Sequence, residues 1–195
     1  LKNPDMSLPW HEGGVGAVDR EAHNRLVTPR TRADLDSITA YVPGKSYPEA
    51  IKLPTNEASL GALPTVRDAI PDAAANANRY PDNGHVALIA ALADHFGVTA
   101  ANIAVGAGSV SLCQELVHAT CNDGDEVMFA WRSFEAYPVV TSVAGAVRVT
   151  VPLTPDYRHD LDAMAAAVTD RTRLIFVCTP NNPTGPALST DELER

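Results

Sequence analysis

The sequence predicts an α/β fold, in which a mostly parallel sheet carries helices on both faces and follows an extended N-terminal arm. Two observations indicate this fold. Short apolar, β-branched runs alternate with segments of helical periodicity from about residue 84 onward, a pattern typical of parallel strands joined by helices. Hydrophobic residues make up 45% of the 195 residues, which is enough for a packed core.

The chain is expected to divide into three regions. Residues 1–37 contain glycines and charges without a sustained hydrophobic period, so a loosely structured segment is expected there. Residues 38–64 hold the proline-containing stretch "YVPGKSYPEA" and are expected to form the extended arm. Residues 65–195 are expected to form the α/β domain.

The first helices are predicted directly after the arm. A helical pattern starts near Thr65, and Pro71 is expected to interrupt it, because proline lacks the backbone N–H and clashes with the preceding turn. Residues 84–97 predict a clear helix with an apolar stripe, and Gly97 is a typical helix stop.

The remainder of the chain is expected to alternate between strands and helices. Strands are predicted over 102–106, 126–131, 146–153 and 173–178, with helices over 109–121, 135–145 and 160–168 and a further helix from 189. Pro138 would lie in a first helical turn, where proline is tolerated. Asp160 is a candidate N-cap, and Ser189 with Glu192 has the spacing of a capping box.

Charge and composition exclude several classes of function. The formal net charge is -9 and the pI is about 5.0, which argues against a nucleic-acid or anionic-membrane surface. No apolar run is long enough to span a bilayer. The three cysteines show no CxxC spacing and the six histidines no ligand spacing, so no metal site is expected. Reduced cysteines favour a cytoplasmic location.

Three loops of different chemistry are predicted at the carboxyl edge of the sheet, where parallel sheets bind ligands. "VGAGS" (105–109) lies between a predicted strand and a helix, and could hold a phosphate on free N–H groups. "WRSFEAYP" (131–138) brings aromatic rings that can stack on a flat cofactor. "TPNNPTGP" (179–186) holds two asparagines between prolines, and an amide fixed there can donate to a ligand oxygen. Together they suit a phosphorylated, planar, oxygen-bearing cofactor.

Two other interpretations of these loops stay open. A dinucleotide site would need a third glycine where Ser111 stands, and an acidic residue after the next strand, which ends "FAW". That interpretation is therefore weak. A tight turn without a ligand at "VGAGS", and aromatic residues that only cover the sheet edge, are the structural alternatives.

Five motifs in order give the chain a family resemblance. "LPTNEASLG", "NRYPDNG", "VGAGS", "WRSFEAYP" and "CTPNNPTG" resemble the class I/II aminotransferases, which are pyridoxal 5'-phosphate (PLP) enzymes of fold type I. The pattern looks like the histidinol-phosphate aminotransferase branch, and "YVPGK" with "WRSFEAYP" looks closest to its aromatic-amino-acid members. The resemblance covers about the N-terminal half of a family member, so residues 65–195 would be part of its PLP-binding large domain.

The resemblance implies a set of cofactor and substrate contacts. The backbone of three consecutive residues would hold the cofactor phosphate, a ring would stack on the pyridine, an amide would donate to the phenolic oxygen, and a tyrosine would reach a partner subunit's phosphate. These residues are, in that order, Gly108, Ser109 and Val110, then Phe134, Asn182 and Tyr80. Tyr41 and Asn56 would lie near the substrate.

The resemblance also implies what the chain lacks. The family's Schiff-base lysine follows the "NPTG" motif, whereas the lysines here are Lys2, Lys45 and Lys52. The catalytic lysine is expected beyond Arg195, and the 195-residue chain alone is expected to be inactive. The expected function is amino transfer from an aromatic amino acid to a 2-oxo acid in a homodimer. The alternatives are a histidinol-phosphate aminotransferase and a non-catalytic ligand-binding or assembly fragment.

Overall fold

The computed structural model describes residues 30–38, 45, 47–51 and 56–194. Contacts within the chain separate two units, residues 1–33 and 34–195. The first unit is described at residues 30–33 alone, and the second contains the sheet. The predicted three-region division stays a prediction.

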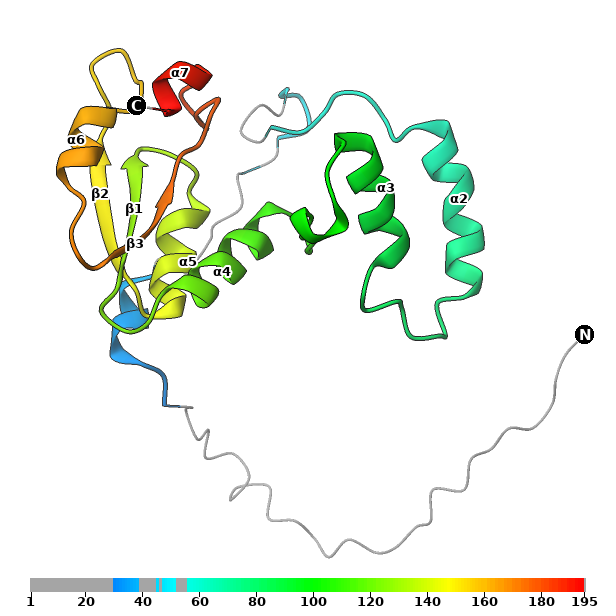
Figure 1. The fold of residues 1–195 in the computed structure, drawn as a ribbon. Helices are drawn as coiled ribbons and strands as arrows, with labels where there is room; N and C mark the ends of the chain where they lie inside the picture. The colour runs from blue at the N-terminus through cyan, green and yellow to red at the C-terminus, as the bar shows by residue number, and fades with distance from the viewer. Residues whose placement is uncertain (1–29, 39–44, 46, 52–55, 195) are drawn as a thin grey trace, which may run out of the picture. The chain divides into compact units, whose positions relative to one another are not determined.

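Figure 1 labels the elements in chain order: η1 (Ala33–Ser37), α2 (Pro64–Ala75), α3 (Val86–Phe96), η2 (Ala100–Asn102), α4 (Ser109–Thr120), β1 (Glu126–Trp131), α5 (Ala136–Ala144), β2 (Val147–Pro152), α6 (Leu161–Ala166), β3 (Thr172–Phe176) and α7 (Thr190–Leu193).

The sheet has three parallel strands in the order β2-β1-β3, so β1 lies in the centre. Four of the six β1 residues, Val127 to Ala130, are completely buried, as expected for a central strand covered on both faces. Successive β1 side chains point to opposite faces of the sheet and so belong alternately to two hydrophobic clusters. The parallel α/β class predicted from the sequence is confirmed.

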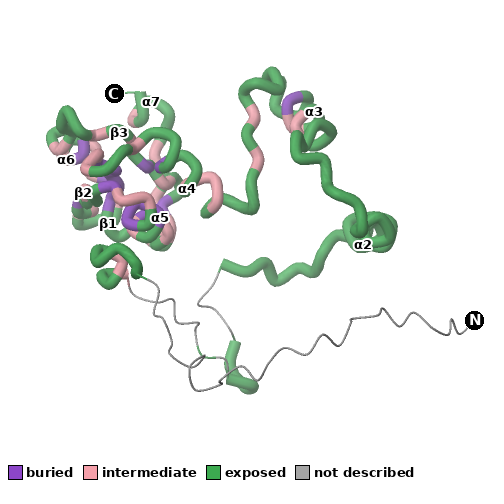
Figure 2. The backbone as a smooth tube through the Cα atoms, turned by 90° about the horizontal axis from the view of Figure 1, so that it is seen from below, coloured by how far each residue is buried: buried purple, intermediate pink, exposed green. Residues whose placement is uncertain are grey.

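Different helices cover the two faces of the sheet. Val127 and Phe129 pack with Val117 of α4 and with Tyr137 and Val140 of α5. The alternate β1 residues, Met128 and Ala130, pack with Val151 of β2 and Met164 of α6. Figure 2 shows the buried residues gathered on the strands and α5. Helices on both faces are therefore confirmed, with α4 and α5 on one face and α6 on the other.

Glu126 fastens the start of β1 to the connection between α6 and β3. Its side chain is 5% exposed and accepts hydrogen bonds from the Thr169 hydroxyl (2.6 Å), the Arg171 guanidinium (2.7 Å) and the Thr172 hydroxyl (3.2 Å). The Thr169 hydrogen bond, followed by the Arg171 charge, lowers the pKa of Glu126. This buried carboxylate is compensated by three donors.

Helix α3 begins after the "PDNG" turn. The Asp82 carboxylate accepts the N–H groups of Gly84 (2.9 Å) and Val86 (2.8 Å), and these bonds lower the pKa of Asp82, with Val86 the larger cause. Gly97 ends the helix at φ 66, as predicted from the sequence. Ala93 is the buried residue of α3, while α2 has none.

Two predictions of local structure are wrong. The strand predicted over 102–106 is absent: Asn102 ends η2, and residues 103–106 pair with none of β1, β2 and β3, so they lack the hydrogen bonds of a sheet. Pro71 does not interrupt α2, which continues through it to Ala75. Pro64 lies in the first turn of α2, where a missing N–H costs no helical hydrogen bond.

The caps predicted for the last helices are confirmed. The Asp160 side chain accepts the N–H of Ala163 at 2.9 Å and opens α6. Ser189 and Glu192 form the capping box of α7. The Glu192 carboxylate accepts the Ser189 N–H and hydroxyl, and these bonds, followed by Arg158, lower the pKa of Glu192 to about 2. Within the described part of the chain, no helix combines the length and apolar character needed to cross a membrane.

Candidate functional site

Three loops leave the carboxyl edge of the sheet. They follow Trp131 of β1, Pro152 of β2 and Phe176 of β3, and parallel strands bring their carboxyl ends to one edge. The β1 loop carries Phe134 and the β3 loop carries Asn182. The sequence places both side chains at this edge. Hydrogen bonds between the β1 loop and the β3 loop join the two loops.

Asn181 is the centre of the joint between the β1 and β3 loops. Its side chain is buried, with the residue 2% exposed. Its Oδ1 accepts the Ser133 hydroxyl at 2.7 Å, and its Nδ2 donates to the Arg132 carbonyl at 3.1 Å and to the Thr184 hydroxyl at 2.7 Å. Every N–H of this amide is therefore bonded to the protein, and Asn181 has no free donor for a ligand.

Asn182 has the opposite environment. It is half-buried, and its backbone N–H donates to the Cys178 sulfur at 3.4 Å. Among the described residues, no partner hydrogen-bonds to its side-chain amide. Of the two adjacent asparagines, Asn182 is therefore the one whose amide can donate to a ligand oxygen.

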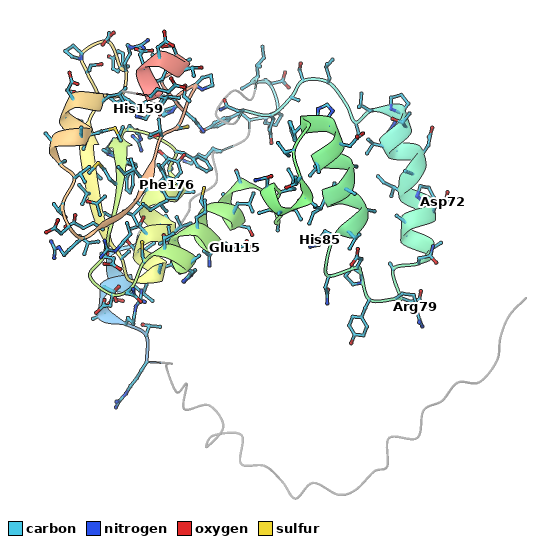
Figure 3. All side chains as sticks on the ribbon, viewed as in Figure 1. Asp72, Arg79, His85, Glu115, His159 and Phe176 are labelled. Carbon is cyan, nitrogen blue, oxygen red and sulfur yellow. The ribbon has the colours of Figure 1, made fainter. Side chains whose placement is uncertain are left out.

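Phe134 belongs to a group of aromatic rings under the β1 loop. It is half-buried and meets Tyr137 edge-on, with ring centroids 5.5 Å apart. Tyr137 in turn stacks on Phe176 at 4.4 Å and 4°, and Figure 3 labels Phe176. These contacts hold the Phe134 ring from one side.

Cysteine and tyrosine side chains lie beneath the same loops. Burial raises the pKa of Tyr137, helped by Cys178 and Cys113, and burial followed by Cys178 raises the pKa of Cys113. Cys113, Cys178 and Phe134 all pack against the same hydrophobic cluster. Because Cys113 lies four residues after Ser109, the first turns of α4 pack close to the end of β3.

The N-terminus of α4 can accept an anion. Gly108 is the N-cap at φ 84, where a side chain would be strained, and no side chain caps the helix. Within the described residues, the N–H groups of Ser109, Val110 and Ser111 have no acceptor. Val110 is 46% exposed, so only its backbone is available for a phosphate.

The loop after β2 also contacts the β3 loop and the segment that follows it. His159, labelled in Figure 3, is 5% exposed and donates through Nε2 to the Cys178 carbonyl at 2.9 Å, while its buried Nδ1 has no partner among the described residues. The Thr184 hydroxyl donates to the Tyr157 carbonyl at 3.0 Å, and Arg158 pairs with Glu192 at 2.6 Å.

The other predicted site residues belong to earlier segments of the chain. Tyr80 is fully exposed in the connection between α2 and α3. Asn56 is described and exposed. Tyr41 lies outside the described residues. The roles of all three stay predictions, as do those of Gly108, Ser109, Val110, Phe134 and Asn182.

Sequence reasoning missed three residues that build the site. Ser133 and Asn181 form a buried hydrogen bond between residues 48 positions apart, and His159 fixes the end of β3. Of these residues, only Asn181 could be suspected from the sequence, because the side chains of two adjacent asparagines in a rigid loop point in different directions and so meet different partners. The positions of Ser133 and His159 offered no such signal.

The parallel sheet, the helices on both of its faces and the loops at its carboxyl edge define an α/β protein of the class that binds ligands at that edge. Comparison with known proteins identifies the family. The family described as aminotransferase class I and II matches residues 48–195. The chain belongs to this family, and its fold is that of the fold type I aminotransferases.

Three similar proteins illustrate the match. An aromatic amino acid aminotransferase of Rhodococcus opacus is 89% identical over 169 residues, covering 87% of this chain and 47% of that protein. The Rhodococcus jostii relative of the same name is 78% identical with the same coverage. The crystal structure of a histidinol-phosphate aminotransferase from Sinorhizobium meliloti, in complex with pyridoxal-5'-phosphate, is 33% identical with a TM-score of 0.61, covering 66% of this chain and 35% of that one. The chain spans about half the length of the curated relatives it matches.

Proposed function

We propose that this chain is the N-terminal part of a PLP-dependent aminotransferase that transfers an amino group from an aromatic amino acid to a 2-oxo acid. The observation that carries the proposal is the Asn182 amide, which has no hydrogen-bond partner among the described residues, while its neighbour Asn181 is bonded to the loop that carries Phe134. A half-buried amide that keeps its donors free, on a loop bonded to the loop that carries an aromatic ring, suits a flat, oxygen-bearing cofactor.

The described residues fit PLP at three points. The free N–H groups of Ser109, Val110 and Ser111 suit its phosphate, because a helix N-terminus favours an anion. The Phe134 ring, supported from one side by Tyr137, suits the pyridine face. The Asn182 amide suits the phenolic oxygen.

The chain's own residues would bind and orient the cofactor. Bound PLP supplies the electron sink that amino transfer requires. Asn182 would hold the ring's orientation through its phenolic oxygen, Phe134 would limit its tilt, and the α4 N-terminus would fix the phosphate. Proton transfer at the reacting carbon is proposed for the lysine that the family resemblance places after the "NPTG" motif, beyond Arg195.

The aromatic donor is proposed on two grounds. The relatives at 89% and 78% identity carry the name aromatic amino acid aminotransferase. In addition, a phosphorylated donor such as histidinol phosphate needs cationic partners. Arg132, the cation of the β1 loop, already pairs with Glu135 at 2.6 Å and lies 5.4 Å from the Trp131 ring centroid. Trp131 is 39% exposed and offers a flat surface to an aromatic side chain.

The donor is tested by comparing kcat/KM for phenylalanine and histidinol phosphate, each with 2-oxoglutarate, on the full-length enzyme. We expect a preference for phenylalanine. A preference for histidinol phosphate of more than about tenfold, roughly 1.4 kcal/mol in transition-state binding, would reverse the donor assignment and leave fold and cofactor unchanged.

We also propose a homodimer in the cytoplasm. The fully exposed Tyr80 is free to contact a second copy, where it would reach the partner's cofactor phosphate. The three cysteines are free thiols, which suits a reducing compartment.

A further inference from the structure

On the basis of the proposed PLP site, we propose that Asn181 is a positioning residue, which holds the loop carrying Asn182 against the loop carrying Phe134. Asn181 itself does not touch the cofactor, because its amide is fully bonded to the protein. It acts through Asn182, which follows it in the chain, and through Phe134, which follows Ser133.

The side chain of Asn181 reaches the β1 loop twice. It accepts the Ser133 hydroxyl at 2.7 Å and donates to the Arg132 carbonyl at 3.1 Å, so both bonds end directly before Phe134 in the chain. Ser133 is completely buried and Asn181 is 2% exposed. Buried hydrogen bonds of this kind are costly to break, because the group that remains is left unsatisfied.

The backbone of Asn181 closes the turn that contains Asn182. The Asn181 N–H donates to the Pro186 carbonyl at 2.9 Å, and the Gly185 N–H donates to the Asn181 carbonyl at 2.7 Å. The remaining N–H of the Asn181 side chain donates to the Thr184 hydroxyl at 2.7 Å. These three bonds surround Asn182. Within the described part of the chain its own amide has no hydrogen-bond partner, so its direction depends on this turn.

The proposal predicts coupling between the adjacent asparagines. If Asn181 acts by aiming Asn182, its removal should matter mainly while Asn182 is present. If Asn181 only stabilises the fold, its removal should lower the unfolding temperature without changing the cofactor's affinity in either background. A double-mutant cycle separates the two cases.

The experiment measures the Kd of PLP for the full-length apoenzyme, together with the visible circular dichroism of bound PLP and the unfolding temperature of the apo form. Five proteins are compared: wild type, Asn181→Ala, Asn182→Ala, the double variant and the control Asn122→Ala. Asn122 suits the control because its amide is also hydrogen-bonded, to Asp125, but is exposed and precedes β1 at the opposite sheet edge.

We expect Asn181→Ala to weaken PLP binding about tenfold and to change the circular dichroism of bound PLP, with Asn122→Ala like wild type. In the Asn182→Ala background the same change should weaken binding less than threefold. An Asn181→Ala enzyme that binds PLP like the control overturns the proposal, as does a loss of threefold or more in both backgrounds.

Two further results are possible: Asn181→Ala does not fold, or the wild-type enzyme binds no PLP. If Asn181→Ala does not fold, Ser133→Ala replaces it in the cycle, because it removes one donor to Asn181 with little change of volume; the same thresholds then decide. If the wild-type enzyme binds no PLP, the proposed function fails, whereas failure of the coupling alone leaves it standing.

Discussion

Two adjacent asparagines at the end of β3 differ in how their amides are bonded. Asn181 is buried with its amide N–H groups donated to protein acceptors. Asn182 is half-buried, and no described residue hydrogen-bonds to its amide. The loop after β3 buries the Asn181 side chain and leaves Asn182 half-buried, and we propose that the Asn182 amide binds a ligand. Residue-level function here depends on bonding within the loop, which the sequence letters do not distinguish.

Replacing Asn182 by alanine should weaken PLP binding by the full-length enzyme. Loss of one hydrogen bond to a charged or polarised oxygen is worth about 1.5–3 kcal/mol, roughly ten- to a hundredfold in Kd. Equilibrium titration of the apoenzyme with PLP measures the change, with Asn122→Ala as the matched control. Wild-type affinity in Asn182→Ala would show that the cofactor does not use this amide.

Replacing Phe134 by alanine should loosen the cofactor by a different mechanism. A stacked ring contributes about 1 kcal/mol beyond its buried area, so Kd should rise by about fivefold or more. The same titration measures it. Because Phe134 also meets Tyr137, Phe134→Leu serves as a control that keeps apolar volume and loses stacking. Equal binding by wild type and Phe134→Leu would remove stacking from the account.

At the scale of elements, short apolar runs were sufficient to predict β1, β2 and β3, because strands covered on both faces bury successive residues. Apolar residues that recur by turns predicted most of the helices. Prediction failed where structure depends on distant partners. The apolar run at 103–106 is not a strand, since no described strand pairs with it. The bond between Ser133 and Asn181 joins two loops whose meeting no local pattern encodes.

Glu126 makes the joint between β1 and the α6–β3 connection dependent on pH. Its folded-state pKa is lowered from 4.5, so its stabilising effect is fully present above that value and is lost as pH falls through the lowered pKa. Glu126→Gln should therefore lower the urea midpoint of the full-length enzyme at pH 7, and the difference from wild type should shrink at lower pH.

The matched control for Glu126 is Glu194→Gln, which changes an exposed carboxylate near the end of α7. It should leave the urea midpoint at pH 7 close to that of wild type. A Glu126→Gln effect that stays constant as pH falls below 4.5 would mean that the three donors around Glu126 do not act through its charge.

At the scale of the whole molecule, Tyr80 predicts that two chains share each site. We expect a mixture of an inactive active-site lysine variant with Tyr80→Phe to be more active than the sum of the two parents. In the mixed dimer, one site combines an intact lysine with the partner's intact tyrosine. Activity is measured after co-refolding the two chains. Mixed dimers that never exceed the sum would place Tyr80 outside the partner's site.

We propose that the α4 N-terminus, Phe134 and Asn182 together bind PLP for amino transfer from aromatic amino acids. This proposal is tested most directly by supplying the full-length enzyme with ¹⁵N-phenylalanine and 2-oxoglutarate, with and without PLP, and measuring ¹⁵N-glutamate by mass spectrometry. We expect labelled glutamate to form well above the rate with free PLP alone, and its formation to be lost when PLP is removed. PLP-loaded enzyme that forms no labelled glutamate from any aromatic amino acid would contradict it.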